Sequence, residues 1–401
     1  MINLEVPKKF TATIEQARLA AEHVFRPVSR QYDREEHTYP KELDMLAAAL
    51  EGLEEAGELS GAGASGVRRE AGGDENRNGG NMVTALGAAE LCWGDVGLLL
   101  SMPRQGLGNA AIASVANDEQ LERFDGMWIA MAITEPDVGS DSAAITTTAV
   151  KDGDHYVLNG TKIFITAGER ADALVVWASL DLSLGRAAIK SFLVEKDTPG
   201  LSFVRVEDKL GIRASDTAQF VLEDCRVPAE NLLGDPEIRT EISFAGAMQT
   251  FDNTRPLVAA MALGVARASL DRTGELFAEA GVELDHDRPA ANQSHAAARL
   301  LAMEADYEAA RLLTMQAAWM ADNSKPNSLQ ASYAKAKAGR ACVDIALECV
   351  ALCGSVGYGE DELLEKWARD AKILDIFEGT QQIQLLIIAR RLLGLSSAEL
   401  K

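Results

Sequence analysis

The stretch Ala132–Asp141 reads AITEPDVGSD and stands where the pattern of the chain changes. Before it, over residues 14–129, alanine and leucine recur with helical spacing, interrupted by a glycine-dense stretch, Gly61–Gly80, that we expect to be a loop. After it, over residues 131–234, short β-branched and aromatic runs are separated by turn dipeptides. The helical spacing returns after Pro236. The chain therefore predicts helices, then β-structure, then helices again.

The β-structure is expected from short runs of residues that suit a pleated, half-buried surface. These runs are Thr146–Thr148, Tyr156–Leu158, Ile163–Thr166, Leu174–Trp177, Phe192–Val194 and Phe220–Leu222. Asp152-Gly153 and Asn159-Gly160 favour turns with positive φ, so we expect an antiparallel sheet built from hairpins. The predicted fold class is α+β and multi-domain: an N-terminal α-helical domain over 1–129, a middle antiparallel β-domain over 130–236, and a C-terminal four-helix-bundle-like domain over 237–401.

The composition argues against several classes of protein. With 47% hydrophobic and 25% charged residues, the 401-residue chain is ordinary for a globular enzyme. A formal net charge of −22 argues against nucleic acid as a partner, because the chain would repel a polyphosphate backbone. The cysteines lack zinc-ligand spacing, so we expect no metal site and buried, reduced thiols. No leader-like start and no run of about 18 apolar residues is found, so we expect a cytoplasmic protein without a membrane span.

Four separated segments resemble the acyl-CoA dehydrogenase family in order, spacing and residue type. They are Ala132–Asp141, Asn159–Gly168, Lys209–Thr217 with Cys225–Pro228, and Arg369–Lys372 with Ile376–Gln382. In the first segment, a proline and glycine turn lets backbone N–H groups and the hydroxyls of Thr134 and Ser140 face a flavin and an acyl thioester without a bulky Cβ between them. The third segment is expected to be structural. The resemblance implies FAD as cofactor and an acyl-CoA as substrate.

The resemblance also implies which residues contact the flavin. Phe164 would stack on the ring where the family usually has tryptophan, so stacking survives but the indole N–H is lost. Thr166 would bond near flavin N5. The expected cofactor-binding residues are Met131, Ile133, Thr134, Gly139, Ser140, Phe164, Thr166, Thr380 and Gln382.

Glu378 matches the position of the family's catalytic glutamate. Alone it could be an ordinary glutamate at a solvated helix end, but the surrounding match favours a catalytic base. A carbon acid beside a thioester is too weak for a carboxylate in water, so the site has to polarise the carbonyl and exclude water, which also makes the carboxylate more basic. The resemblance implies that the Glu378 backbone N–H helps to bind the thioester oxygen, and that the product is the trans-2-enoyl-CoA.

The segment Phe251–Pro256 is similar to the family segment that meets the CoA portion. Arg255 can pair with an anion or lock a helix start, because Asp252 and Arg255 are also spaced for helix capping. The expected substrate-binding residues are Ser140, Asp252, Arg255, Phe377 and Gly379. Acyl-chain length stays open, with Met102, Phe251 and Phe377 as candidates for the pocket wall.

The chain departs from the family where a neighbouring subunit usually grips the flavin adenylate. The family's arginine falls on or near Ala280 and its phenylalanine near Glu283, while its glutamine falls on Ala351 and its double glycine on Gly354-Ser355. These changes remove charge-assisted donors and add like charge. We therefore expect a hetero-oligomer (α2β2) whose sister subunit supplies the missing grip, otherwise a homotetramer, with an electron-transfer flavoprotein as acceptor. A flavin-poor structural partner of a catalytic sister chain, and an oxidase of the same fold, are the alternatives.

Overall fold

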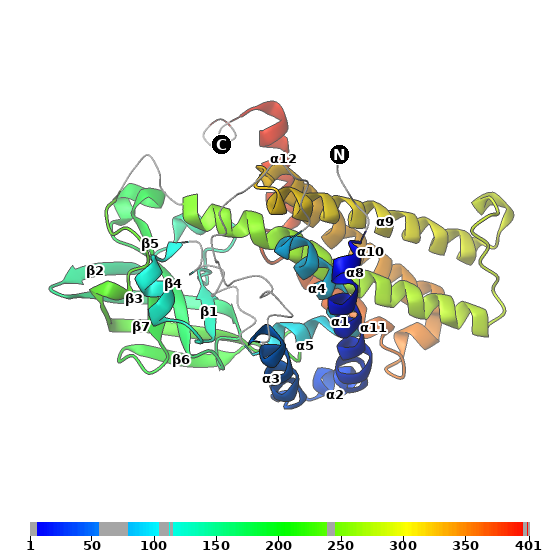
Figure 1. The fold of residues 1–401 in the computed structure, drawn as a ribbon, viewed down its shortest axis with the longest axis horizontal. Coiled ribbons are helices and arrows are strands. Elements are labelled where there is room, and N and C mark those ends of the chain that lie inside the picture. The colour runs from blue at the N-terminus through cyan, green and yellow to red at the C-terminus, as the bar shows by residue number, and fades with distance from the viewer. Residues whose placement is uncertain are drawn as a thin grey trace.

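The structure is a computed structural model and describes residues 6–55, 79–103, 112, 115–238, 245–395 and 399, without the side chains of residues 49–55 and 245–253. The β-domain lies at one end of the molecule and the helices fill the other end (Figure 1). The expected loop Gly61–Gly80 lies outside the described residues except for its last two, and Gly80 begins a helix. The predicted order of helices, β-domain and helices is confirmed.

Short helices form the N-terminal part of the described chain. They are α1 (Thr11–Ala20), α2 (Arg26–Arg34), α3 (Glu42–Glu55), α4 (Gly80–Gly94), α5 (Val96–Ser101) and α7 (Asp118–Arg123). A π-helical turn, Ala21–Phe25, joins α1 to α2 and packs on the end of α4. The contact requires Gly94, because a Cβ there would lie 2.9 Å from the backbone of Ala21. Asp95 then caps α5 by accepting a hydrogen bond from the Leu98 N–H at 2.9 Å.

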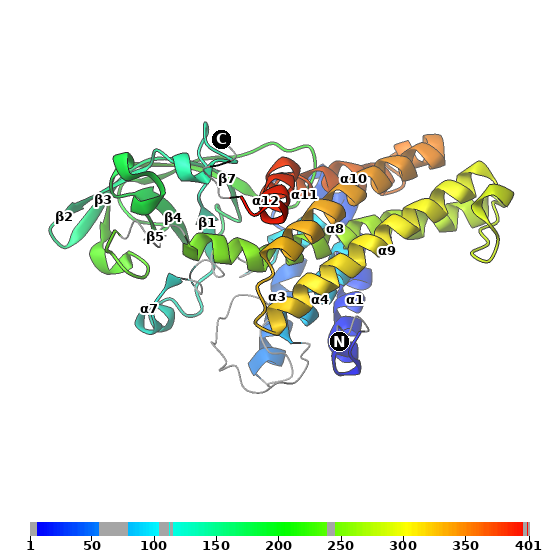
Figure 2. The ribbon, with the colours of Figure 1, turned by 90° about the horizontal axis from the view of Figure 1, so that it is seen from above.

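Long helices form the C-terminal part. They are α8 (Ala245–Glu279), α9 (His295–Asp322), α10 (Ser328–Tyr358), α11 (Leu364–Leu374) and α12 (Gln381–Leu393). Helix α8 begins beside the β-domain and runs through the helical part (Figures 1 and 2). Helix α10 packs against α8, α9, α11 and α12, which gives the expected bundle. The polar segment His286–Gln293 lies between α8 and α9, as expected.

One hydrophobic core joins the N-terminal and C-terminal helices. Phe25, Leu98, Leu300, Cys342 and Trp367 all belong to it, and each is no more than 1% exposed. The helical ends of the chain therefore fold around the same interior, although the β-domain separates them in sequence. The cysteines are free thiols, and all are buried except the half-buried Cys353.

In the part of the chain that the structure describes, α10 is the one helix long and apolar enough to cross a membrane by length and composition. It packs among α8, α9, α11 and α12. Lys335, in the first third of the helix, is fully buried. These contacts are those of a core helix in a bundle.

The β-domain is a seven-stranded sheet with strand order β1-β4-β2-β3-β7-β6, and β5 pairs with β4. Its strands are β1 (Ile129–Ala132), β2 (Thr148–Asp152), β3 (His155–Thr166), β4 (Ala173–Ser179), β5 (Ile189–Glu195), β6 (Leu201–Val206) and β7 (Thr217–Pro228). Most pairs are antiparallel, as expected, but β1 pairs with β4 in parallel, and β2 meets β4 in parallel at one position. The long connection between β1 and β4, which includes a hairpin, permits this parallel pair.

One of the two expected turns is confirmed and the other is wrong. Asp152 pairs with His155 across a tight β2–β3 turn in which Gly153 has a φ of +63°. Asn159-Gly160 instead lies inside β3, where the register with β7 shifts between Leu158 and Gly160. A Cβ at Gly160 would lie 2.8 Å from the Thr147 Cα, so this glycine serves a β-bulge and a close approach of two chain segments.

Two strands were not among the expected runs. β1 contains alanine and methionine, and β6 exposes most of its side chains at the sheet edge. β1 has only one β-branched residue, and β6 has Phe203 and Val204 but leaves them exposed. The expected runs Tyr156–Leu158 and Ile163–Thr166 are parts of the single long strand β3.

The connection between β6 and β7 docks into the helical part. The Ile212 N–H donates to Asp370 Oδ1 of α11 at 2.5 Å, and Ser101 of α5 donates its hydroxyl to the Ala214 carbonyl at 2.7 Å. Ile212 and Ala214 belong to the helical core. Gly211 lies directly on α11, where a Cβ would come within 2.5 Å of the Arg369 backbone. The segment Lys209–Thr217 thus has the structural role expected of it.

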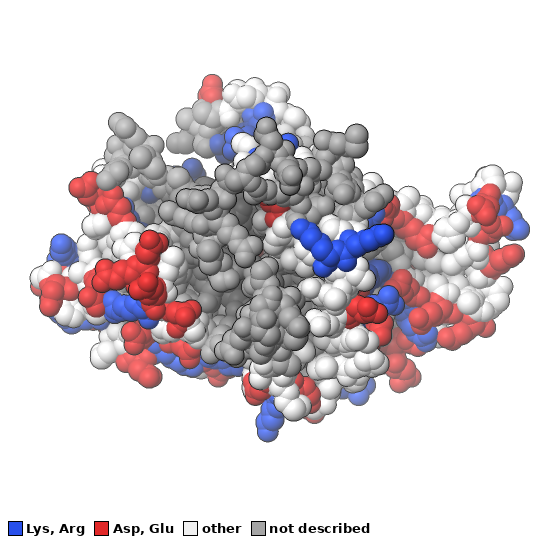
Figure 3. Space-filling model, viewed as in Figure 1, with Lys and Arg blue, Asp and Glu red and all other residues white. Residues whose placement is uncertain are grey.

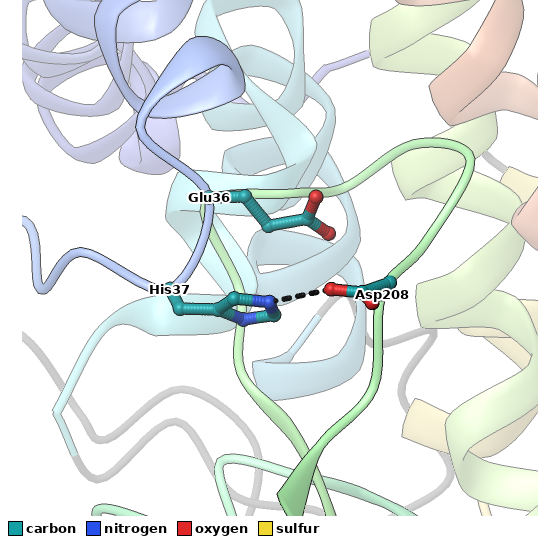
Figure 4. Close-up of side chains that lie close together, drawn as sticks. All are labelled: Glu36, His37 and Asp208. Carbon is teal, nitrogen blue, oxygen red and sulfur yellow. Dashed lines mark hydrogen bonds and ion pairs between the residues drawn. The ribbon is translucent and has the colours of Figure 1, made fainter.

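A second contact between the N-terminal helices and the β-domain lies beside this loop (Figure 4). His37 Nε2 lies 2.9 Å from Asp208 Oδ1, and Glu36 Oε1 accepts the Lys209 N–H at 3.0 Å. Each of Glu36, His37 and Asp208 has one oxygen or nitrogen atom that could bind a metal ion, and these three atoms lie within 4.8 Å of one another. Glu36 also lies 3.6 Å from the Arg213 guanidinium. We therefore interpret these three residues as polar contacts that join the segment after α2 to the β6–β7 connection.

The chain has 61 acidic and 39 basic side chains among its Asp, Glu, Lys and Arg residues. On the face shown in Figure 3, acidic side chains occur at both the β-domain end and the far helical end, with basic groups among them. This distribution fits the net charge of −22 and presents no continuous basic face among the described residues on this side.

Candidate active site

Glu378 lies in the connection between α11 and α12, in an unusual backbone conformation. Glu378 has a φ of +56° and Gly379 a φ of +89°. A left-handed conformation costs a residue other than glycine roughly 1–2 kcal/mol, so the surroundings have to hold it. Two side chains do so: Lys335 Nζ donates to the Gly379 carbonyl at 2.7 Å, and Gln384 Nε2 donates to the carbonyls of Glu378 and Gly379 at 3.1 Å each. Thr380 then caps α12.

The Glu378 carboxylate meets α8. The Thr254 hydroxyl donates to Glu378 Oε2 at 2.8 Å. Burial raises the pKa of Glu378 above its ordinary value, while the Thr254 hydrogen bond and the charges of Arg255 and Lys335 act in the opposite direction. The site therefore holds a carboxylate that binds a proton more strongly than it would in water.

Arg255 follows Thr254 in α8 and is only 3% exposed. Its charge acts on both Glu378 and Lys335. The expected residues Phe251 and Asp252 lie in the same helix, but their side chains lie outside the described residues. Of the expected substrate-binding residues, Phe377 and Gly379 flank Glu378 in the chain, and folding brings Arg255 close to it.

A buried ion pair holds the turn that follows β1. Glu135 lies 2.8 Å from Lys162 Nζ of β3 and accepts hydrogen bonds from the N–H and hydroxyl groups of Thr146 and Thr147. Burial opposes the ionisation of Glu135, but Lys162 and the threonines outweigh it and lower its pKa to about 2. Burial lowers the pKa of Lys162 to about 8 against the pull of Glu135. Both groups are therefore charged at neutral pH.

Phe164 projects from a bulge of β3 next to this turn. The register between β3 and β7 shifts between Lys162 and Ile165, and Phe164 has a φ of +58°. Its side chain is 60% exposed, which is unusual for a phenylalanine in a strand. The Ile163 N–H donates to the Thr134 carbonyl at 2.9 Å, so Phe164 and Thr134 are neighbours. The bulge turns an aromatic ring outward beside the residues expected to contact the flavin.

The remaining expected cofactor residues divide between the two parts of the fold. Met131, Ile133 and Thr166 are half-buried on or beside β1 and β3, and Gly139 and Ser140 are exposed in the turn after Val138. Thr380 and Gln382 lie at the start of α12, the former half-buried and the latter exposed. Phe377 is half-buried against the helical core, and Met102 is buried inside it.

Several residues that build the site are not predicted from the sequence. Three of them, Thr254, Glu135 and Lys162, lie within the segments that resemble the family. The resemblance marks their positions but does not give their roles. Lys335 and Gln384 have no such signal, because a lysine or glutamine in a helix usually faces solvent. Only the packing of α10 and α12 on the connection makes them donors to it.

Comparisons with known proteins match both the β-domain and the C-terminal helices of this chain. Residues 130–225 match the acyl-CoA dehydrogenase middle domain, and residues 244–393 match the acyl-CoA dehydrogenase C-terminal domain. The short-chain specific acyl-CoA dehydrogenase of mouse mitochondria is 36% identical over 98% of this chain and 92% of its own length. The acryloyl-CoA reductase (NADH) of Anaerotignum propionicum is 34% identical over 96% of each chain.

A solved structure supports the same relationship. The butyryl-CoA dehydrogenase of Megasphaera elsdenii is 30% identical and superimposes with a TM-score of 0.80 over 98% of this chain and all of its own. The fold and the sequence relationship together cover nearly the whole chain. The chain belongs to the acyl-CoA dehydrogenase family and is an FAD-dependent oxidoreductase that dehydrogenates acyl-CoA.

Proposed function

We propose that Glu378 is the base that removes the Cα proton of a saturated acyl-CoA, so that the product is the trans-2-enoyl-CoA. The observation that carries the proposal is the half-buried Glu378, whose carboxylate has a raised pKa and accepts a hydrogen bond from the Thr254 hydroxyl. A base that takes a proton from carbon gains from weak solvation of its charged form. The Cα–H bonding electrons form the new double bond as hydride leaves Cβ.

The described residues fit FAD on the side of its ring. Phe164 offers an exposed aromatic face, and Thr134 lies beside it. When bound, FAD supplies the acceptor for the hydride. We propose that the β-domain residues hold the ring and that Thr380 and Gln382 contact the cofactor from α12. The proposed β-domain set is Met131, Ile133, Thr134, Gly139, Ser140, Phe164 and Thr166.

We propose that the substrate contacts Ser140, Asp252, Arg255, Phe377 and Gly379. Arg255 is 3% exposed, and its charge acts on Glu378, which favours contact with the thioester end over a role for the guanidinium at the surface. A buried guanidinium there would also stabilise negative charge that develops on the thioester oxygen. A short acyl chain is our proposal for the substrate, because the mouse and Megasphaera elsdenii relatives are named for short-chain substrates.

We also infer an assembly with a sister subunit in the form α2β2. The family's usual arginine, phenylalanine and glutamine are replaced here by Ala280, Glu283 and Ala351. All three residues are exposed and can therefore contact a neighbouring subunit. Leu347 and Tyr358 lie on the same helix as Ala351 and are 55% and 79% exposed. An apolar exposed face beside a weakened flavin grip supports a partner that covers it. We further propose a cytoplasmic location and an electron-transfer flavoprotein as the electron acceptor.

The test uses the chain purified alone and then with candidate sister chains. Saturated acyl-CoAs of different chain lengths are added one at a time without oxygen, and the visible absorbance of the bound flavin is measured after each addition. We expect bleaching with a short-chain substrate, and none in Glu378→Gln at equal flavin content. Unchanged bleaching in that variant would remove Glu378 as the base.

The alternative function is a flavin-poor structural partner of a catalytic sister chain. The weakened adenylate grip favours it, whereas the complete Glu378 site argues against it. A preparation that stays colourless, and whose Glu378→Gln variant leaves the activity of the assembled hetero-oligomer unchanged, would establish this alternative.

A further inference from the structure

Two helices converge on the backbone of the connection that carries Glu378. Lys335 comes from α10 and Gln384 from α12, and both side chains are fully buried. Each donates to the Gly379 carbonyl, and Gln384 also donates to the Glu378 carbonyl. Both residues therefore act on the peptide groups beside Gly379, Lys335 on the one that follows it and Gln384 on both.

The backbone conformation decides where the Glu378 carboxylate points. With a φ of +56°, the Cβ of Glu378 leaves the chain in a direction that a right-handed conformation would not give. That direction brings the carboxylate to the Thr254 hydroxyl at 2.8 Å. Because a left-handed glutamate is unfavourable by itself, relaxation of the connection would carry the carboxylate away from α8.

Burying these two donors costs free energy, which hydrogen bonds to the Glu378 and Gly379 carbonyls offset. A buried lysine loses its hydration, and burial lowers the pKa of Lys335 to about 8. Its charge acts on Asp375 and Glu378 and is opposed by Arg255. A methionine would fill the same space without that cost. The charged donor is therefore explained by what it binds, a carbonyl group next to the base.

We propose that Lys335 and Gln384 are positioning residues that clamp the Glu378 and Gly379 carbonyls and so hold the Glu378 carboxylate in its reacting position. Lys335 has a second effect, because its positive charge favours the ionised form of Glu378. The proposal rests on the proposed role of Glu378 as the base. It assigns a catalytic consequence to two helical residues whose hydrogen bonds go to the backbone of the connection.

The test compares Lys335→Met and Gln384→Met in the flavin-loaded protein, purified with its partner chain if the flavin requires one. We expect each variant to lower the maximal rate of acyl-CoA-dependent flavin bleaching by about 10- to 100-fold, the scale of a base displaced by about 1 Å. The apparent Kd for the acyl-CoA should change little. The acid limb of the pH profile should move to higher pH only in Lys335→Met, because only that change removes a positive charge near Glu378.

Rescue and a matched control separate positioning from general stability. Lys335→Arg keeps a charged donor, so it should recover part of the rate and return the acid limb toward its original pH. Lys337→Met removes a lysine two residues along α10 that pairs with Asp306 at the surface, and it should leave the rate and the pH profile unchanged.

The outcomes distinguish this proposal from the one on which it rests. Bleaching that persists in Glu378→Gln would refute the base, whatever Lys335 does. If Glu378→Gln is inactive while both methionine variants bleach at the original rate per bound flavin, only the clamp is refuted. Failure of both methionine variants to fold would also overturn the clamp, because the two side chains would then serve the fold.

Discussion

At the scale of single residues, the contact between Thr254 and Glu378 sets how readily the carboxylate gives up its proton. The Thr254 hydroxyl donates to the ionised form, which opposes the effect of burial on the pKa of Glu378. A hydrogen bond to a charged group contributes about 1.5–3 kcal/mol, so its loss should be measurable.

Thr254→Val should therefore raise the pKa of Glu378 further. The base works only when deprotonated, so the acid limb of the bleaching rate should move to higher pH by about one to two units, since each pKa unit corresponds to about 1.36 kcal/mol. Single-turnover bleaching measured across pH reports this shift. Thr314→Val is the control, since the buried Thr314 hydroxyl donates to the Ala310 carbonyl of its own helix. If the acid limb of the bleaching rate stays at the same pH in Thr254→Val, the hydroxyl does not stabilise the carboxylate.

Glu135 is a second residue whose charge state is fixed by its partners. Its pKa in the folded protein is about 2, below the ordinary value of 4.5. A depressed pKa contributes stability that is present above the unfolded value and is lost as the pH falls from about 4.5 toward 2. Part of the acid sensitivity of the β-domain should therefore come from this group.

Glu135→Gln should destabilise the protein by about 3–5 kcal/mol at neutral pH, because it leaves Lys162 buried without its partner. It should also flatten the loss of stability between pH 4.5 and about 2. Urea unfolding at several pH values measures both effects. Glu230→Gln, which breaks an exposed pair with Arg123, is expected to change the unfolding free energy by under about 1 kcal/mol. Equal behaviour of the two variants would contradict this account.

Sequence and structure agree on the site to different degrees for physical reasons. Glu378 could be proposed from sequence because the residues around it form an extended match. Lys335 and Gln384 could not, because burial of a polar side chain depends on helices that meet only after folding. The raised pKa of Glu378 was expected from the chemistry of a weak carbon acid, and the structure gives its cause as burial.

At the scale of elements, periodicity predicted the helices better than the strands. Long helices such as α9 repeat their signal many times, whereas β1 and β6 have only 4 and 6 residues in which to show a pattern. The Asn159-Gly160 dipeptide has the composition of a turn but lies in a bulge, because its meaning depends on the Thr147 backbone that lies against it.

The loop between β6 and β7 couples the β-domain to α11, the helix that precedes Glu378. Gly211→Ala should break this coupling, because the new Cβ would lie within 2.5 Å of the Arg369 backbone. We expect a loss of about 1–3 kcal/mol, as for other overpacked sites, and earlier melting of the β-domain. Calorimetry and near-UV circular dichroism detect the change.

The control for this variant is Gly87→Ala in α4, where nothing lies within 4 Å of the added Cβ. Alanine there should stabilise the helix by up to about 1 kcal/mol. A Gly211→Ala protein as stable as the unsubstituted chain would show that the loop is free to move off α11.

At the scale of the whole molecule, the surface carries evidence of a partner. Large apolar side chains on two helices are exposed. On α12 four leucines are each more than 40% exposed: Leu385, Leu386, Leu392 and Leu393. On α10 more than half of the surface of Leu347 and of Tyr358 is exposed. A monomer that left these side chains in water would present large apolar surfaces. Either a second copy or a sister chain can cover them, so exposure alone does not decide the composition of the assembly.

The residues at the flavin adenylate grip are what favour the proposed sister chain over a second copy. In a homo-oligomer, each copy would offer its neighbour's flavin the exposed Ala280, Glu283 and Ala351, which supply no cationic or amide donor. We therefore expect the chain expressed alone to hold less than one FAD per subunit, and co-expression with the correct sister chain to raise flavin content and yield an α2β2 mass. Native mass spectrometry with flavin counting gives both quantities.

An engineered variant tests the cause directly. Ala280→Arg combined with Glu283→Phe and Ala351→Gln should raise the flavin content of the chain expressed alone, because it restores a cation and an amide and removes a like charge from the pyrophosphate site. The matched control is Ala278→Arg, an exposed alanine near the same helix end that adds a cation without restoring the family pattern. A homotetramer with one FAD per subunit, formed by the unsubstituted chain alone, would refute the sister subunit, since the present surface would then suffice for the cofactor.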